Sequence, residues 1–380
     1  MTQLPPLSLY IHIPWCEQKC PYCDFNSHAR KGVIPEAEYI AALLADLEQD
    51  LPLAAGRTLR SIFIGGGTPS LISPDGIKTL LDGVHARLPL QPGCEVTMEA
   101  NPGTLEADRF QPYREAGVNR LSVGVQSFQQ DKLNLLGRIH GADEARRAAT
   151  EARKAGFERF NLDLMHTLPG QSVDDALYDL AQAIALAPPH LSWYQLTIEP
   201  NTQFASKPPK LPDEDTQWAI FEQGKAMLEA AGYRQYEISA WAQPGYQCEH
   251  NLNYWRFGDY LGIGCGAHGK VTQRDNSLLR TVKVRHPKGY LEPGRNPMDS
   301  QHLVEKEDQA LEYYMNRLRL MEPMPLAELS QRTQLTSQEV KRPLDWALQR
   351  QLIRVDPQQM QLTDLGHRYL NELLGQFLPD

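Results

Sequence analysis

The stretch HIPWCEQKCPYCDF (residues 12–25) holds three cysteines, Cys16, Cys20 and Cys23, in the spacing C-x3-C-x2-C. A 4Fe-4S cluster has four irons to ligate, and three thiolates from one short loop leave one iron open to a non-protein ligand. The loop directly follows an apolar, strand-like segment, residues 7–13. The spacing therefore predicts a cluster for chemistry or for binding a small molecule, rather than a closed electron relay.

Zinc, disulfides and buried thiols are the alternative uses of these cysteines. Structural zinc takes four nitrogen or sulfur ligands, mostly as two closely spaced pairs, and no second pair of that kind follows downstream. Disulfides belong to oxidising compartments and to small, cysteine-dense chains. This chain has 6 cysteines in 380 residues and no recognisable export signal. An iron-sulfur cluster is the prediction that these observations favour.

The composition is that of an ordinary soluble protein large enough for two or three domains. Hydrophobic residues make up 41% and charged residues 22% of the chain. The formal net charge of −9 argues against broad binding to a phosphate backbone, because nucleic-acid binders carry a basic face. No apolar run reaches membrane-spanning length. We expect a cytoplasmic protein with reduced thiols.

Apolar, strand-like runs alternate with amphipathic helical stretches in the first part of the chain. The runs lie at residues 7–13, 61–66, 95–100, 120–125, 159–165 and 191–198. Such alternation is typical of βα units that build a parallel sheet. Six units are fewer than the eight of a complete barrel of about 250 residues. The sequence therefore predicts an α/β fold, with a partial (βα)6 barrel over residues 1–205.

Two further regions follow. The proline-rich segment TQFASKPPKLPDED (202–215) predicts a linker, and an extension is expected over residues 206–300. Helices followed by a predicted hairpin, LIRVDPQQMQLT (352–363), are typical of a winged-helix domain, here residues 301–380. Residues 305–380 carry 12 acidic and 9 basic side chains. A domain that binds in nucleic-acid grooves needs an excess of basic side chains. We therefore expect a packing or lid role for this domain.

Polar residues stand where the expected strands end, and ligands of parallel α/β folds bind at that edge. The segment GGGTP (65–69) offers unobstructed backbone, although a simple tight turn explains it equally well. Glu99, Gln126 and Asp163 follow or end the next three strands. Arg138 has the planar guanidinium that pairs with a carboxylate. Each alone would be structural, but together they predict a pocket above the cysteine loop.

These residues resemble the radical S-adenosylmethionine (SAM) superfamily, in the branch of the oxygen-independent coproporphyrinogen III oxidase-like proteins. The resemblance covers nearly the whole chain. It implies a partial (βα)6 barrel whose cluster binds the amino and carboxylate groups of SAM at its open iron. By position, Cys16, Cys20 and Cys23 match the cluster ligands. The remaining matches to the SAM site are Tyr10, Tyr22, Gly66, Gly67, Thr68, Glu99, Gln126, Arg138 and Asp163.

Two departures separate the chain from the decarboxylating oxidase itself. That enzyme has a further cysteine two residues after the third cluster ligand, where this chain has Phe25. It also has a long segment before the first strand, whereas nine residues precede Tyr10 here. Both departures argue against decarboxylation of a porphyrinogen.

The segment CEHNLNYWRFGDY (248–260) matches the HNxxYW motif of the haem-chaperone branch of the same family. An imidazole at His250 can ligate iron, and Tyr254, Trp255 and Phe257 offer flat apolar surface for a porphyrin. A lone loop histidine is more often only hydrogen-bonded, so haem ligation here is what the resemblance implies. Cys248 is an alternative thiolate ligand. His12 and His268 are expected to serve structure or to line the cofactor pocket.

The resemblance implies a haem chaperone that uses a 4Fe-4S cluster and SAM and passes haem to membrane cytochromes such as those of respiratory chains. A haem donor protein and at most peripheral membrane contact belong to that expectation, and nucleic acid does not. Oxidative decarboxylation of the two propionates of coproporphyrinogen III is the alternative. A winged-helix regulator with a cluster sensor is a third hypothesis, and it predicts salt-sensitive DNA binding.

Overall fold

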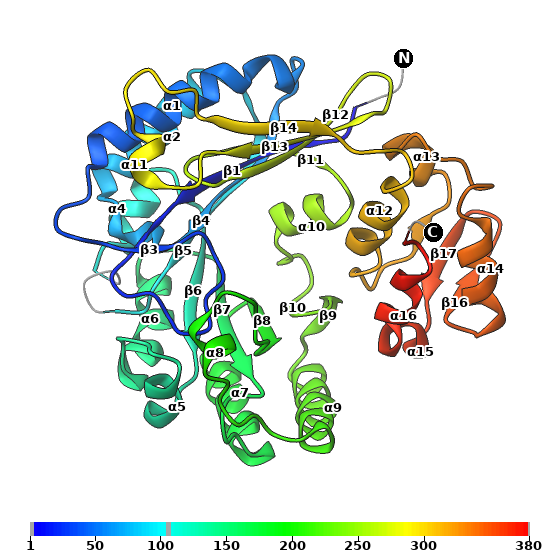
Figure 1. Cartoon of the computed structure of the whole chain (residues 1–380). Helices are drawn as coiled ribbons and strands as arrows, with labels where there is room; N and C mark the ends of the chain where they lie inside the picture. The colour runs from blue at the N-terminus through cyan, green and yellow to red at the C-terminus, as the bar shows by residue number, and fades with distance from the viewer. Residues whose placement is uncertain (1–3, 104–107, 379–380) are drawn as a thin grey trace.

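The computed structural model describes residues 4–103 and 108–378, and within them twelve strands form one curved sheet (Figure 1). Six of these strands lie side by side in the order in which they occur in the chain. Each is parallel to the next, as βα units require. They are β1 (Leu7–Ile13), β4 (Leu59–Gly66), β5 (Leu90–Ala100), β6 (Arg120–Gln126), β7 (Arg159–His166) and β8 (His190–Gln195). The six strands predicted from the sequence are therefore confirmed, with ends shifted by up to five residues.

The parallel sheet does not close into a barrel, because other strands continue it at both edges. β11 (Asp259–Ile263) pairs with β1 in parallel, and three antiparallel strands follow: β12 (His268–Thr272), β13 (Leu278–Lys283) and β14 (Met298–Leu303). Beyond β8 come β10 (Ala240–Ala242) and β9 (Arg234–Glu237). Glycine-rich and aromatic stretches after the first helix of the extension predict loops, whereas the structure has six short strands there. β11 pairs with β1, which is distant in sequence, and β12, β13 and β14 each pair with the strand before them.

Helices cover the convex face of the sheet (Figure 1). The larger ones are α1 (Glu36–Ala54), α2 (Pro74–His85), α6 (Ala142–Lys154), α7 (Val173–Ala185) and α9 (Glu214–Ala230). Shorter helices are η1 (Pro69–Leu71), α4 (Phe110–Glu115), α5 (Gln130–Leu135) and α8 (Gln203–Ser206). Local sequence fixes several starts: Ser73, Ser172 and Asp213 each accept a hydrogen bond from a first-turn backbone N–H.

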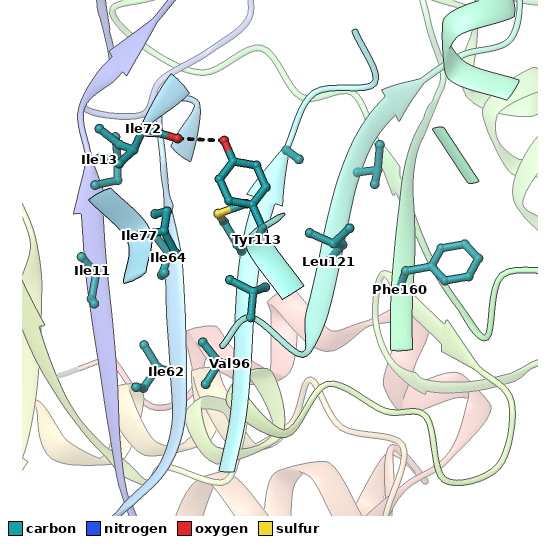
Figure 2. Packing of buried hydrophobic residues seen from close by; sticks show 14 of the residues in the cluster. Ile11, Ile13, Ile62, Ile64, Ile72, Ile77, Val96, Tyr113, Leu121 and Phe160 are labelled. Carbon is teal, nitrogen blue, oxygen red and sulfur yellow. Dashed lines mark hydrogen bonds between the residues drawn. The ribbon is translucent and has the colours of Figure 1, made fainter. Parts of the chain in front are cut away.

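Strand residues alternate between an apolar convex face and a polar concave face. Ile62 and Ile64 of β4 pack in the main core, and so do Val96 of β5 and Leu121 of β6 (Figure 2). Tyr113 closes this layer, and its hydroxyl donates to the Ile72 carbonyl at 2.7 Å. Residues of opposite parity therefore face the inside of the curve, where ligands can reach them.

The C-terminal part has its own core. Its elements are α12 (Gln309–Arg317), β15 (Met324–Pro325), α13 (Glu328–Arg332), α14 (Lys341–Gln349), β16 (Ile353–Val355), β17 (Gln359–Leu362), α15 (Asp364–Arg368) and α16 (Leu370–Gly375). The three strands form a small antiparallel sheet in the order β15-β17-β16. Helices followed by this hairpin give the expected winged-helix-like arrangement. Phe257 and Leu278 from the extension pack into this core.

The domain bounds 1–205, 206–300 and 301–380 stay a prediction, and residues 1–3, 104–107 and 379–380 of these ranges lie outside the described residues. Among the described residues, no helix is both long and apolar enough to cross a bilayer.

We expect Ile64→Ala to lower the free energy of unfolding by about 2–5 kcal/mol, because it leaves a cavity in the convex-face core. Ile64 has no exposed surface, whereas Val33 is 94% exposed. The matched control Val33→Ala should change stability by less than about 0.5 kcal/mol. Denaturant unfolding measures both, and equal losses would contradict the proposed core.

Candidate functional site

Backbone hydrogen bonds hold the cysteine loop in place on two sides. It lies between β2 (Trp15–Cys16) and β3 (His28–Ala29), which pair with each other. The Pro14 carbonyl accepts from the His28 N–H at 2.7 Å, and the Pro21 carbonyl accepts from the Phe204 N–H at 3.0 Å. The loop is thereby fixed both to its own flanks and to α8, beyond the last parallel strand. All three cysteines are free thiols.

A cavity of about 280 Å³ opens beside this loop at the carboxyl ends of the strands. This cavity is lined by all the site residues that were matched from the sequence, except Tyr10 and His250. The lining set is Cys16, Cys20, Tyr22, Cys23, Gly66, Gly67, Thr68, Glu99, Gln126, Arg138 and Asp163. The structure thus brings together residues that are up to 147 positions apart in the sequence. We call this cavity the cysteine pocket.

The GGGTP segment is more than a simple turn. Gly67 N–H donates to the Ile13 carbonyl at 2.7 Å, and Thr68 N–H donates to the Trp15 carbonyl at 2.7 Å. A Cβ on Gly67 would lie 2.5 Å from the Trp15 oxygen. Gly66 adopts φ +115°, which side chains rarely allow. The backbone can therefore lie directly against the entry to the cysteine loop.

Glu99 is the carboxyl group at the end of β5. It accepts from the Gly66 N–H at 3.1 Å. Burial, with a further contribution from the charge of Asp163, raises the pKa of Glu99 to about 8. The group is therefore largely protonated at neutral pH. A positively charged amino group bound in the cysteine pocket would favour the ionised form, so this residue fits an ammonium-bearing ligand.

Arg138 joins the cysteine loop to the strand ends. One terminal nitrogen donates to Asn101 Oδ1 at 2.8 Å and to the Gly124 carbonyl at 2.7 Å. The other lies 3.7 Å from Cys20 Sγ. Its Nε is buried and has no hydrogen-bond partner among the described residues, which is costly unless a ligand satisfies it. A fixed cation with a spare donor beside thiolates fits a carboxylate ligand and an anionic cluster.

Two inward residues of β6 and β7 complete the pocket. Gln126 has φ 69°, a strained conformation for a residue with a side chain, and its Oε1 accepts from the Tyr194 hydroxyl at 2.7 Å. Asp163 accepts from Ser122 Oγ at 3.0 Å and from Asn161 Nδ2 at 2.7 Å. Burial raises the pKa of Asp163 despite these bonds. Both side chains are therefore held in place by neighbouring strands.

The donor set of the loop suits a cluster better than a single ion. Within residues 4–103 and 108–378, no three His, Cys, Asp or Glu side chains are grouped as ligands of one metal ion. The thiolates of a cubane bind different irons, so they need not converge on one point. Burial raises the pKa of the Cys16 thiol. Binding of iron would release the thiol proton and leave the thiolate that ligates the metal.

A second cavity, of about 850 Å³, lies against the concave face and contains Tyr10 and His250. We call it the aromatic cavity, because Phe63, Tyr254, Trp255 and Tyr260 also line it. Its volume is in the range of about 300–1,000 Å³ common for small-molecule sites. Phe25, Gly66 and Glu99 line both cavities. The two sites therefore adjoin at the ends of β4 and β5.

The helix that carries the HNxxYW motif, α10 (Glu249–Trp255), lies inside the curve of the sheet (Figure 1). The buried carboxylate of Glu95 on β5 accepts from the backbone N–H of Glu249 at 3.2 Å and of His250 at 3.1 Å. Arg120 on β6 lies 3.9 Å from the same carboxylate. This buried charge pair fixes where α10 begins, and with it the position of His250.

The imidazole of His250 is neutral and firmly oriented. Nδ1 lies 3.0 Å from Ser61 Oγ, and the ring packs 5.1 Å from that of Phe63. Burial, and then the charge of Arg120, lowers the pKa of His250 to about 3. In the described parts of the chain, Nε2 has no hydrogen-bond partner. A neutral imidazole with one unbonded nitrogen is what iron ligation requires.

Two expectations about this motif are wrong. Phe257 does not line the aromatic cavity: it is buried in the C-terminal core, 5.4 Å from the ring of Tyr313. Cys248 is fully buried, its sulfur donates to Glu95 at 3.4 Å, and burial raises its pKa to about 12. A neutral thiol turned towards β5 is a poor candidate for an iron ligand. His12 and His268 line the aromatic cavity and not the cysteine pocket.

Other lining residues were not singled out from the sequence. Ser122, Gly124 and Tyr194 line the cysteine pocket, and Phe63 and Tyr260 line the aromatic cavity. Strand alternation could have found most of them, because they share the parity of neighbouring inward residues. Asn101 and Arg285, which come from connecting segments, carry no such signal.

Known proteins are similar to this chain in sequence and in fold. The pattern of the Radical SAM superfamily matches residues 10–182, and that of the HemN C-terminal domain matches residues 304–369. The chain is 60% identical to the heme chaperone HemW of Escherichia coli (strain K12) and 55% identical to that of Haemophilus influenzae, covering 100% of each chain. The solved coproporphyrinogen III oxidase (HemN) of Escherichia coli superposes with a TM-score of 0.83 at 23% identity, over 98% of this chain and 90% of that one.

The open, mostly parallel sheet and the three-cysteine loop at its carboxyl edge define a radical SAM protein. This confirms the predicted fold class. Within that superfamily, the full-length identities show that the chain belongs to the HemW family.

We expect Glu99→Gln to change the pH dependence of stability. Between about pH 4.5 and 8, folded Glu99 holds a proton that the unfolded chain has lost. The wild type should therefore lose stability relative to Glu99→Gln as pH rises through this window, by at most about 5 kcal/mol in total. Outside the window the difference should be constant. Denaturant unfolding of the ligand-free proteins across pH 4–9 measures it.

The control for this experiment is Glu229→Gln, at an exposed position on α9. It should show no such trend. A pH-independent difference between wild type and Glu99→Gln would contradict the raised pKa.

Proposed function

We propose that this chain is a haem chaperone that holds haem in the aromatic cavity and passes it to membrane cytochromes, such as those of respiratory chains. The observation that carries the proposal is the neutral imidazole of His250 on the wall of an aromatic-lined cavity. Among the described residues Nε2 has no hydrogen-bond partner, so it can ligate iron, and the aromatic rings can pack on the porphyrin. The relatives named heme chaperone HemW support the same function.

In this proposal, the cysteine pocket holds a 4Fe-4S cluster and SAM. Cys16, Cys20 and Cys23 would hold three irons, and the fourth iron would take the amino and carboxylate groups of SAM. When bound, the cluster supplies an electron and a coordination position. The chain's own groups orient SAM: Glu99 would accept from its amino group, Arg138 would neutralise its carboxylate, and the Gly66–Gly67 backbone would lie along its methionine part.

The remaining contacts belong to the adenosyl part of SAM. Tyr22 would pack on the adenine, with Gln126, Asp163 and Thr68 as further polar contacts. Tyr10 lies on the aromatic-cavity side, 2.9 Å from His12 Nδ1. Tyr10 would therefore contact SAM beside Glu99, which lines both cavities.

The proposed partners follow from the cargo. Haem would come from a donor protein and leave to haem-accepting cytochromes, and contact with the membrane would be peripheral, at its inner face. Nucleic acid is not a proposed partner, because the net charge of −9 opposes it. Coproporphyrinogen decarboxylation is the competing activity of the fold. The exposed Phe25, where the oxidase has a further cysteine, argues against it.

Cluster assembly should depend on the loop cysteines. Anaerobic reconstitution with iron and sulfide should give about four irons per wild-type chain and the broad visible absorbance of a 4Fe-4S cluster. The triple variant Cys16→Ser, Cys20→Ser, Cys23→Ser should assemble none. Cys94→Ser, which removes a buried thiol on β5, should assemble the cluster normally. An unaltered cluster in the triple variant would contradict the ligand assignment.

Haem binding should depend on His250. We expect His250→Ala to weaken haem binding by about 10-fold to 100-fold and to shift the haem absorbance, because an iron ligand is lost. The control His85→Ala, at an exposed position on α2, should bind haem like the wild type. Titration of the anaerobically purified proteins measures both, followed by transfer to an apo-cytochrome.

Two results would overturn the functional proposal. One is the absence of haem binding by the cluster-loaded wild type. The other is release of carbon dioxide from coproporphyrinogen III at an enzymatic rate in the presence of SAM and a reductant, which would identify the decarboxylase instead.

A further inference from the structure

The aromatic cavity has a cation at its mouth in addition to the imidazole on its wall. Arg285 follows β13 and lines the cavity. Its backbone is anchored, because its carbonyl accepts from Asn26 Nδ2 at 2.9 Å and from Cys265 Sγ at 2.8 Å. The side chain is exposed. A fixed backbone with a solvent-facing guanidinium places a positive charge at the cavity entrance.

Among the described residues that line this cavity, Arg285 is the cation without a counter-ion. Lys283 also lines the cavity, but Asp46 and Asp50 neutralise it at 2.6 and 2.8 Å. Nearby Arg280 pairs with Glu312 at 2.5 Å. Within the part of the chain that the structure describes, no carboxylate lies within ion-pair distance of Arg285. Its charge is therefore available to a ligand.

Three imidazoles lie near Arg285, and two carboxylates line the same cavity. His268 lines the cavity, and the rings of His28 and His286 lie 5.4 Å apart beside it. Burial first, and then nearby charged groups that include Arg285, lowers the pKa of His28 and of His268, so both remain neutral hydrogen-bonding groups near pH 7. Asp24 and Asp299 also line the cavity. A propionate would therefore be attracted to the arginine and repelled by these two carboxylates.

We propose that Arg285 binds a propionate carboxylate of haem whose iron faces His250 in the aromatic cavity. This rests on the proposed haem function and specifies its geometry. Haem carries both propionates on one edge of a flat ring, so it can offer iron to a wall residue while its carboxylates remain at the mouth. The guanidinium suits this task because its parallel N–H groups match the two carboxylate oxygens.

The same contact would link haem to the cysteine loop. Asn26 holds the Arg285 carbonyl and lies three residues after Cys23. Asn26 also donates to the Cys265 carbonyl at 2.9 Å. The segment that fixes the arginine is therefore the one that leaves the cluster loop.

The test combines a change in the protein with a change in the ligand. Ferric haem and its dimethyl ester, which lacks the carboxylate charges, are titrated into wild type, Arg285→Ala and Arg295→Ala. Arg295 is a matched control, since it lies in the next loop, pairs with Glu292 at 3.4 Å and does not line the cavity. Absorbance reports both affinity and iron ligation.

We expect wild type and Arg295→Ala to prefer haem over its ester by about 10-fold to 100-fold, as for a charge-assisted pair. Arg285→Ala should bind haem about as weakly as wild type binds the ester, and should show no preference. The absorbance of haem bound to Arg285→Ala should match the wild type, because His250 is intact.

The outcomes separate this proposal from the functional one. If wild type binds haem but does not distinguish the ester, or if Arg285→Ala keeps the preference, the propionate assignment is wrong and haem binding stands. If wild type binds neither ligand, the haem function itself is wrong. An altered absorbance in Arg285→Ala would place the arginine at the iron and would also contradict the assignment.

Discussion

The alternation of side chains along six parallel strands is the constraint on which the rest of the structure depends. Apolar residues such as Ile62 and Ile64 point outwards under the helices and form the main core. Their neighbours point into the curve, where Glu95, Glu99 and Asp163 would be intolerable in an apolar core. Because further strands continue the sheet instead of closing it, this polar face stays open to ligands.

The second constraint is that α10 lies inside the curve. A helix carrying apolar and aromatic side chains reduces the concave space, and the buried Glu95 carboxylate fixes its start through two backbone N–H groups. What remains is a cysteine pocket at the strand ends and an aromatic cavity beside it, with Glu99 and Gly66 on both walls. The proposed cofactor and the proposed cargo would thus be neighbours.

Much of this was predictable from the sequence, for physical reasons. Period-two patterns identify the parallel strands, and the polar residues at their ends converge because parallel strands end at one edge. The short strands of the extension were not predictable, because each is only a few residues long and because the pairing of β11 with β1 joins segments distant in sequence. Tyr254 and Trp255 line the cavity as predicted, but the position of Phe257 was not predictable. Phe257 turns into the C-terminal core, and Phe63 from β4 takes a place in the cavity.

The central claim is that two different iron sites share one concave face. Anomalous diffraction at the iron edge, from crystals of anaerobically reconstituted and haem-loaded protein, tests it directly. The account predicts iron density within bonding distance of the sulfurs of Cys16, Cys20 and Cys23, and a separate iron beside Nε2 of His250. Haem iron outside the curve of the sheet, or no cluster iron at the cysteine loop, would contradict it.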